Sequence, residues 1–533
     1  MKKQPKTTHQ TNMPSQNNKY FVMDVDAANI KELLDTLQQQ SDLIESKNDI
    51  INKKSEVIDA QQKRIKMLEE YLRLERARLY ARSSEQSPAQ GLLFNEAEQE
   101  ADEVEQQEND APKKKKGNGG RKGLSKNIPR EQVRLNLTDE EKEGSINTFY
   151  TVIKEELDII PAKVRVLEYL QEKAVFADGD KRIIREARLP KHPIPKSIAS
   201  VGLLAYVIVA KYCDGLPLYR LEKILARYGG TITRTTMANW MIRLSLQLQP
   251  LINLMREHQL AYDYIQADET RIQVLKEPGR SVLSDKYMWV TLGGPPDKPA
   301  ILFEYDPSRS QEVPLRLLDG FSGYLQTDGY AGYDAVCKKQ HLIRLGCMDH
   351  ARRYYVDALK SVPKKSRSTK MSKAAIAIEK IGLLYEIERE IKDLTPDQRY
   401  LERQNRSVPL LNEFKAWVDS NIAKVEKDSL TRKAMNYTCN QWSRLIAYCE
   451  DGRLHMSNIL AENAIRPFVC GRKAWLFADT PKGAKASAMY YSLIESAKAN
   501  NLEPYDYLHK MLKRLPYAET VEDFEALLPW NMK

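Results

Sequence analysis

The chain has 533 residues, with 83 Lys and Arg against 73 Asp and Glu and a net charge of +10. This length allows several domains, and the modest positive charge favours a polyanionic partner. Six cysteines without a paired C-x-x-C motif are typical of reduced thiols, and the longest apolar run, Ile198 to Ala210, is too short to cross a bilayer. Composition therefore argues against a disulfide-rich secreted protein and against a membrane protein, and we expect a cytoplasmic one.

The first twenty residues are polar, and we expect a disordered tail over residues 1–27. Residues 28–82 have the pattern of a coiled coil, because an aliphatic side chain returns at every seventh position from Ile30 to Leu79. The companion positions of the heptad are polar at Gln40, Lys47, Lys54 and Gln61. We therefore expect a homo-oligomer formed through this helix, with an open number of chains. The alternative is a long helix folded back on the rest of the protein.

The next segment, residues 83–130, has an acidic half and a basic half. Asn95 to Asp110 carries eight acids and no base, and Lys113 to Gly123 is rich in Lys, Arg and Gly. Neither half can bury an apolar core, so we expect a disordered linker. The basic half either contacts DNA phosphates or is merely solvated.

Residues 131–190 alternate in short β-like pieces, at Phe149–Lys154, Lys163–Leu167 and Ala174–Asp178. We expect a small β module there. No cysteine occurs between Met1 and Tyr212, so a zinc site built from cysteine pairs is excluded from this segment.

Residues 191–258 have a helical pattern. An apolar helix ends near Cys213, a second runs from Leu218 to Tyr228, and a third follows Thr231. Two short helices and a Gly-containing turn before a polar-faced helix resemble a helix-turn-helix. We expect Arg234 and Asn239, early in the third helix, to contact DNA. A helical bundle that binds nothing has the same pattern.

Residues 259–358 alternate strands with one helix, which predicts the first part of an α/β core. The expected strands are Tyr262–Leu275, Tyr287–Leu292, Ala300–Tyr305, Gly323–Asp328 and Leu342–Met348, with a helix at Ser310–Leu318. Asp268 lies inside the first strand, and Asp328 ends the fourth. A carboxylate in a core strand is costly to bury unless a charge compensates it, and a divalent cation is the usual compensation. The alternative is an acid on the solvent face of a strand.

A third acid is expected on a later helix, because in a ribonuclease H-like sheet the first and fourth strands are neighbours and their acids share one metal site. Glu462 is the candidate. Its helix is expected to begin with Ser457 as N-cap and to end near Pro467. The alternative is an ordinary surface ion pair with Arg466, four residues on.

Five motifs occur in order along the chain: Asp268, Thr327–Tyr330, Cys347–Arg353, Glu462–Ala478 and Tyr491–Lys498. Together they resemble the transposases of the insertion sequence 66 family, from about Glu131 to Leu515. The resemblance implies a DDE transposase with a ribonuclease H-like catalytic core, in which Asp268, Asp328 and Glu462 bind metal. Mg²⁺ is the implied cofactor, with Mn²⁺ as a substitute. Converging carboxylates repel one another unless cations intervene, and two metals then serve phosphoryl transfer.

The implied partners are double-stranded DNA, as terminal inverted repeats and as target DNA, and companion proteins of the same element. The implied location is the cytoplasm, at the bacterial nucleoid. Basic residues near the acids are further candidates for DNA contact: Arg352, Arg353, Arg466, Arg472 and Lys473. Asp349 and His350 are candidates for a supporting role beside the metals, although a packed or hydrogen-bonded histidine is the simpler interpretation.

Residues 359–454 are expected to be a helical insertion, since the interval from Asp328 to Glu462 is more than twice that from Asp268 to Asp328. Residues 455–480 return to the core with the Glu462 helix and a strand-like segment, and residues 481–533 form a C-terminal helical segment. The chain departs from the family in lacking zinc-site cysteines and in the residues flanking Glu462. Two other hypotheses stay open: a metal-dependent nuclease of the same fold, and a catalytically weakened DNA-binding protein.

Overall fold

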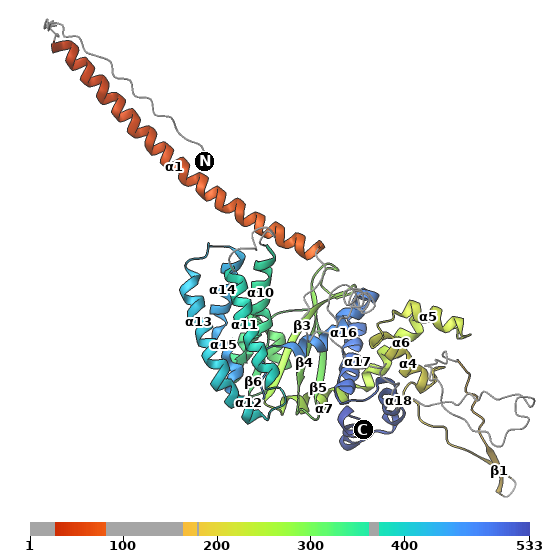
Figure 1. Ribbon diagram of the computed structural model, residues 1–533. Helices are drawn as coiled ribbons and strands as arrows, with labels where there is room; N and C mark the ends of the chain where they lie inside the picture. The colour runs from red at the N-terminus through yellow and green to blue at the C-terminus, as the bar shows by residue number, and fades with distance from the viewer. Residues whose placement is uncertain (1–26, 81–163, 179–180, 362–371, 533) are drawn as a thin grey trace, which may run out of the picture. The chain divides into compact units, whose positions relative to one another are not determined.

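The computed structural model describes residues 27–80, 164–178, 181–361 and 372–532 (Figure 1). Contacts divide the chain into two compact units: residues 1–79 together with 360–362, and all the rest. The expected tail and linker lie outside the described residues, apart from residue 27, as does the first predicted strand of the β module.

Helix α1 (Ala27–Tyr80) is a single helix of 54 residues, which confirms the helix predicted over this stretch. Its heptad residues from Leu37 to Leu72 are exposed, and the exposed fraction is 57% for Ile51 and 50% for Ile58. Exposed apolar side chains in such a stripe are buried when the helix packs against another helix or surface. Pairing of α1 between copies of the chain stays a prediction.

A two-stranded hairpin is described in the predicted β module. It is formed by the antiparallel strands β1 (Lys173–Asp178) and β2 (Lys181–Glu186). The strand predicted at Ala174–Asp178 is therefore confirmed. The strand predicted at Lys163–Leu167 is wrong over the described residues 164–167, which form none. A strand needs a neighbour for its backbone groups, and in the described part of the chain β1 and β2 pair with each other and with no third strand.

Between residue 191 and the main sheet the structure describes the helices α4 (Val201–Tyr212), α5 (Leu218–Arg227), α6 (Arg234–Gln247) and α7 (Gln249–Leu260). The hydroxyls of Ser200 and Thr233 cap α4 and α6, and Gly229 adopts a φ of 85° in the turn between α5 and α6. The three helices predicted within residues 191–258 are thus confirmed, as α4, α5 and α6. Their role as a helix-turn-helix stays a prediction.

A mixed sheet with the strand order β5-β4-β3-β6-β7 lies at the centre of the larger unit. Its strands are β3 (Tyr264–Val274), β4 (Lys286–Gly293), β5 (Ala300–Asp306), β6 (Tyr324–Gln326) and β7 (Ile343–Leu345). β3 is antiparallel to β4 and β4 to β5, whereas β3, β6 and β7 run parallel. The short β8 (Phe477–Ala478) pairs with the far end of β3. The five predicted strands are confirmed, although β6 and β7 are shorter than expected.

Helices cover both faces of this sheet. α16 (Ile459–Trp475) packs on β3 and β4, and α17 (Pro481–Ala499) packs on β5 (Figure 1). The other face carries α8 (Glu312–Leu317) and α9 (Asp334–Gln340), where Leu317 and Val336 share a core with Ala267. Because side chains alternate along a strand, neighbouring residues of β3 face different helices.

β5 lies at the edge of the sheet, where outward backbone groups are free to pair with another chain unless they are covered. α17 covers them with two hydroxyls. Ser496 Oγ accepts the N–H of Ile301 at 2.9 Å, and Ser492 Oγ accepts the N–H of Phe303 at 2.8 Å. These backbone groups of the edge are therefore satisfied within the chain.

The described residues between β7 and α16 are mainly helical, as predicted. The helices are α10 (Met348–Ser361), α11 (Lys373–Glu390), α12 (Pro396–Glu402), α13 (Val408–Ile422), α14 (Leu430–Asn440) and α15 (Trp442–Ile446). After α17 come α18 (Pro504–Arg514) and α19 (Val521–Glu525). None of the described helices combines the length and apolarity needed to cross a membrane.

The bounds predicted for the Glu462 helix are wrong at both ends. The N-cap is Asn458 rather than Ser457, and the helix continues through Pro467 to Trp475. An internal proline costs roughly 3 kcal/mol, because it removes a backbone donor and crowds the preceding turn. Phe468, fully buried in the main core, belongs to the packing that holds the helix together across Pro467.

Candidate active site

Asp268 lies in the middle of β3, on the face covered by α16. Residues 266, 268 and 270 share one face of the strand, and the two outer ones contact α16. Gln266 accepts the N–H of Ala461, and Thr270 accepts from Arg472 at 3.3 Å. One oxygen of Asp268 accepts the backbone N–H of Glu269 at 2.8 Å. The strand therefore points the first predicted acid towards the helix that carries the third.

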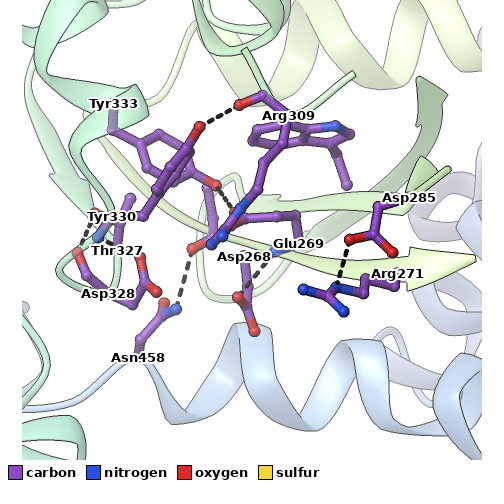
Figure 2. A network of polar contacts seen from close by, with 12 residues as sticks. Asp268, Glu269, Arg271, Asp285, Arg309, Thr327, Asp328, Tyr330, Tyr333 and Asn458 are labelled. Carbon is purple, nitrogen blue, oxygen red and sulfur yellow. Dashed lines mark hydrogen bonds and ion pairs between the residues drawn. The ribbon is translucent and has the colours of Figure 1, made fainter. Parts of the chain in front are cut away.

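Asp328 follows β6, which is the parallel neighbour of β3. The register pairs Gln266 with Gln326, so the chain leaves β6 beside the middle of β3. The strand ends at Gln326, two residues earlier than predicted, and Asp328 lies in the turn that follows. Its Oδ1 accepts the N–H of Tyr330 at 2.9 Å, which fixes the carboxylate in this turn (Figure 2).

Glu462 lies in the first turn of α16, with 15% of its side chain exposed. Its Oε2 is 3.8 Å from Nη2 of Arg353, and its Oε1 is 3.6 Å from Nδ1 of His350. Oε1 has no hydrogen-bond partner among the described residues. The acid therefore pairs with Arg353 across to α10, whereas the alternative considered from the sequence was a surface ion pair with Arg466.

The three acids influence one another electrostatically. The pKa of Asp268 is raised well above its ordinary value, chiefly by burial, next by the charge of Glu269, and further by Glu462 and Asp328. Burial also raises the pKa of Glu462, and Arg353 opposes that rise. The structure thus brings Asp268, Asp328 and Glu462 together from β3, the turn after β6 and α16.

These residues fit a hard divalent cation. Carboxylate oxygens are the ligands such ions prefer, and Glu462 Oε1 is a buried oxygen that no described residue hydrogen-bonds. Ligand atoms of Cys347, His350 and Glu462 also lie within 4.8 Å of one another. Cys347 Sγ, however, already accepts the N–H of Asn458 at 3.3 Å, and burial raises the pKa of this thiol. The carboxylates, with His350 beside them, are the better donors.

A second network lies on the opposite face of β3 and was not predicted. Glu269, with 1% of its side chain exposed, accepts from Arg309 at 2.6 and 2.8 Å and from the hydroxyl of Tyr333 at 2.8 Å (Figure 2). Glu269 stands next to Asp268 in sequence, and strand alternation alone places it on the other face. Its partners are distant in sequence, so no local signal could have identified them.

Asn458 is a further residue that sequence reasoning did not single out. Its side chain donates to the carbonyl oxygen of Ala267 at 3.0 Å (Figure 2). Its backbone N–H donates to Cys347 Sγ at 3.3 Å. Asn458 thereby ties the start of α16 to the residue before Asp268 and to the start of α10.

A cavity of about 340 Å³ opens beside Asp328. It is lined by Arg309, Asp328, Gly329, Tyr330, His350, Tyr354, Tyr437, Asn440 and Gln441. The rings of Tyr354 and Tyr437 lie 4.6 Å apart, and the guanidinium of Arg309 stacks on Tyr330 at 3.9 Å. Aromatic faces and a cation next to an acid form a surface suited to a nucleic-acid strand.

The other predicted residues are dispersed. Asp349 accepts from the hydroxyl of Tyr385, and Arg472 donates to Thr270. Along α10 and α16, Arg352, Arg466 and Arg472 are half-buried, and Arg353 and Lys473 are exposed. Arg234 and Asn239 are exposed on α6 and do not line the cavity beside Asp328. Among these cations, Arg353 pairs with the predicted acid Glu462.

Fold and site together define an α/β protein in which a cluster of carboxylates lies between a mixed sheet and a covering helix. A family model described as "Transposase IS66 family" matches residues 196–486, and "IS66 C-terminal element" matches residues 492–530. A third, "Transposase C of IS166 homeodomain", matches residues 67–133. The chain belongs to the IS66 family of transposases. This membership bears out the resemblance and supports a transposase role.

Relatives from Sinorhizobium fredii extend over most of the chain. The protein y4qI is 32% identical over 393 residues, which is 71% of each chain. The protein y4jD is 30% identical over 405 residues, covering 73% of this chain and 77% of the relative. Both are described as uncharacterized proteins, so they support the family and add no activity.

Proposed function

We propose that this chain is a DDE transposase that cleaves the ends of its insertion sequence and joins them to target DNA. Asp268, Asp328 and Glu462 are the catalytic carboxylates. The observation that carries this proposal is their convergence from three separate elements, with the pKa of Asp268 raised by burial and by neighbouring acids. Family membership supports the same activity.

The sheet supports a ribonuclease H-like core. Its order places β3, the strand of Asp268, between β4 and β6. Three antiparallel strands are followed by two parallel ones, which brings the first and fourth strands side by side. This is the arrangement that the sequence predicted for a shared acid site.

Asp268, Asp328 and Glu462 would hold the divalent cations, with Mg²⁺ as the natural ion and Mn²⁺ as its substitute. When bound, a pair of such ions supplies Lewis acidity for an in-line displacement at phosphorus. The carboxylates of the chain supply the negative charge that attracts the ions and fixes their positions.

The cations of α10 suit the substrate. Arg353 pairs with Glu462 and has 45% of its side chain exposed, so it can also reach a phosphate of the DNA end. Arg309 and Tyr330 line the cavity beside Asp328, where a DNA strand next to the reacting phosphate would lie.

Arg234 and Asn239 on α6 are the proposed contacts to the terminal repeats, and α1 is the proposed oligomerisation helix.

The proposal is tested with Asp268→Asn in full-length protein. We expect Mg²⁺-dependent cleavage and joining of end-bearing DNA to disappear, while DNA binding measured by gel shift stays within twofold. Asp319→Asn is the matched control, because Asp319 is an exposed acid paired with Lys339 at 3.4 Å. Unchanged cleavage by Asp268→Asn would remove the catalytic assignment. Cut ends without joined strands in the wild type would instead indicate a nuclease of the same fold.

A further inference from the structure

Two buried glutamines precede the proposed catalytic aspartates by two residues each. Gln266 precedes Asp268 on β3, and Gln326 ends β6 just ahead of Asp328. The two glutamines are register partners in the parallel pair of strands, and neither exposes any surface. Burial this deep is costly for an amide unless its polar atoms are bonded.

The hydrogen bonds fix the orientation of both amides. Gln326 Nε2 donates to the carbonyl oxygens of Gly346 at 3.1 Å and His455 at 2.7 Å, so Gln326 Oε1 is left as an acceptor. That oxygen accepts from Gln266 Nε2 at 2.9 Å. Gln266 Oε1 in turn accepts the N–H of Ala461 at 3.1 Å. One directed chain of bonds therefore links α16, β3, β6 and the end of β7.

The bond to Ala461 matters because of where it lies. Ala461 immediately precedes Glu462, and its N–H is one of the first-turn amides that a helix cannot satisfy itself. Asn458, the N-cap residue, gives α16 no side-chain cap: its Nδ2 donates to Ala267, and its Oδ1 accepts from no described residue. Gln266 supplies the missing acceptor from the neighbouring strand, so the first turn of α16 is positioned by β3.

We propose that the Gln266–Gln326 pair is the positioning device that sets the distances among the three carboxylates. This inference rests on the proposed function. Gln266 joins β3, the strand of Asp268, to the turn of α16 that carries Glu462. Gln326 joins β6, the strand that leads to Asp328, to Gln266. Three like charges that repel one another need such a restraint to stay in the geometry that divalent ions require.

The chemistry of the amide explains why glutamine stands at both positions. A glutamate at residue 266 could not donate to Gln326 and would add another negative charge beside the acids. A methionine of similar size would leave the N–H of Ala461 without its acceptor and would remove one of the two donors to Gln326 Oε1. The hydroxyl of Tyr264 completes the network, since it donates to Gln326 Oε1 and accepts from Gln266 Nε2 at 2.8 Å.

Gln259 provides a matched control for the effect of losing a buried amide. It is 1% exposed and donates to the carbonyl oxygens of Thr291 at 3.1 Å and Ala300 at 3.0 Å, on β4 and β5. These bonds reach none of the elements that carry the three acids. A methionine there removes a comparable polar network without touching the proposed positioning pair.

The experiment measures Mn²⁺ affinity by calorimetry and thermal unfolding by circular dichroism, with full-length wild type and the variants Gln266→Met, Gln326→Met and Gln259→Met. We expect all three variants to lose thermal stability. Only the first two should lose Mn²⁺ affinity, by 10- to 100-fold, the range typical for residues that orient metal ligands. The double variant of residues 266 and 326 should bind no worse than either single variant, because the pair acts as one unit.

Equal Mn²⁺ affinity in Gln266→Met and Gln259→Met would overturn the inference and leave the proposed function standing. The proposed function itself would be overturned if the wild type did not bind Mn²⁺, or if it bound Mn²⁺ equally well after Asp268→Asn. This inference would then fall with it. If Gln266→Met does not fold, Gln266→Glu takes its place. That variant keeps the acceptor for Ala461 but loses the donor to Gln326, and wild-type affinity in it would equally contradict the inference.

Discussion

Arg353 of α10 lies 3.8 Å from Glu462 of α16, so the nearest cation to this acid belongs to another helix. Its charge lowers the pKa of Glu462, which burial otherwise raises, and Arg466 has a smaller effect in the same direction. Removing Arg353 should therefore raise the pKa of Glu462 further.

The first prediction concerns the pH dependence of cleavage. Because Glu462 is expected to act as a carboxylate, the acidic limb of the pH–rate profile should move to higher pH in Arg353→Gln. Arg466→Gln should move it less. The measurement is the rate of Mg²⁺-dependent nicking across pH 5–9, and a larger shift in Arg466→Gln than in Arg353→Gln would contradict the assignment.

The second prediction concerns the network behind Asp268. Glu269→Gln should destabilise the fold by roughly 1–3 kcal/mol, because a charge-assisted bond to Arg309 and a bond to Tyr333 lose their acceptor charge. Arg309 is 40% exposed and can turn to solvent, which keeps the cost below that of a fully buried pair. Urea unfolding measures the effect, with Asp285→Asn as control, since Asp285 forms an exposed pair with Arg271. If Glu269→Gln lowers the free energy of unfolding no more than Asp285→Asn does, the network around Glu269 does not stabilise the fold.

The third prediction follows from the raised pKa of Asp268. Between the ordinary pKa and the folded one, the folded protein holds a proton that the unfolded chain has lost. The free energy of unfolding should therefore fall as pH rises through this window. Asp268→Asn removes the group and should flatten this part of the curve, measured without divalent ions, whereas Asp319→Asn should not. Parallel curves for wild type and Asp268→Asn would show that Asp268 titrates normally.

The fourth prediction concerns cations. Mg²⁺ or Mn²⁺ should raise the melting temperature of the wild type, because a ligand that binds only the folded state stabilises it by about 2.7 kcal/mol at a hundredfold excess over Kd. EDTA should reverse the shift. Asp328→Asn and Glu462→Gln should abolish it, and Asp319→Asn should keep it. A shift that survives in both site variants would place the ion elsewhere.

The fifth prediction concerns α1. Ile51→Asp combined with Ile58→Asp should reduce the oligomeric state in solution. Both side chains are at least half exposed in the single chain and lie on the apolar stripe that would pack between copies. Asn52→Asp, one residue off the stripe, is the control. Light scattering after gel filtration measures the mass, and an unchanged mass in the double variant would favour the alternative of a helix without partner copies.

The main elements of the sheet were predictable because their signals are local. β-branched and aromatic residues mark β3, β4 and β5, and the observed bounds differ from the predicted ones by few residues. Pro467 misled the prediction because the helix continues through the burial of residues such as Phe468 in a core formed by distant parts of the chain. The partners of Glu269, and the bond from Ala461 to Gln266, depend on tertiary contacts that no local pattern records.

The cover that α17 places over β5 has a consequence for shortened copies of the protein. Ser492 and Ser496 come late in the chain, so a polypeptide that stops before them leaves the N–H groups of Ile301 and Phe303 bare on an apolar strand. The uncovered edge of β5 in such a product would pair with strands of other molecules, and the product would aggregate. A frameshifted gene would then yield insoluble material instead of a competitor that occupies DNA ends.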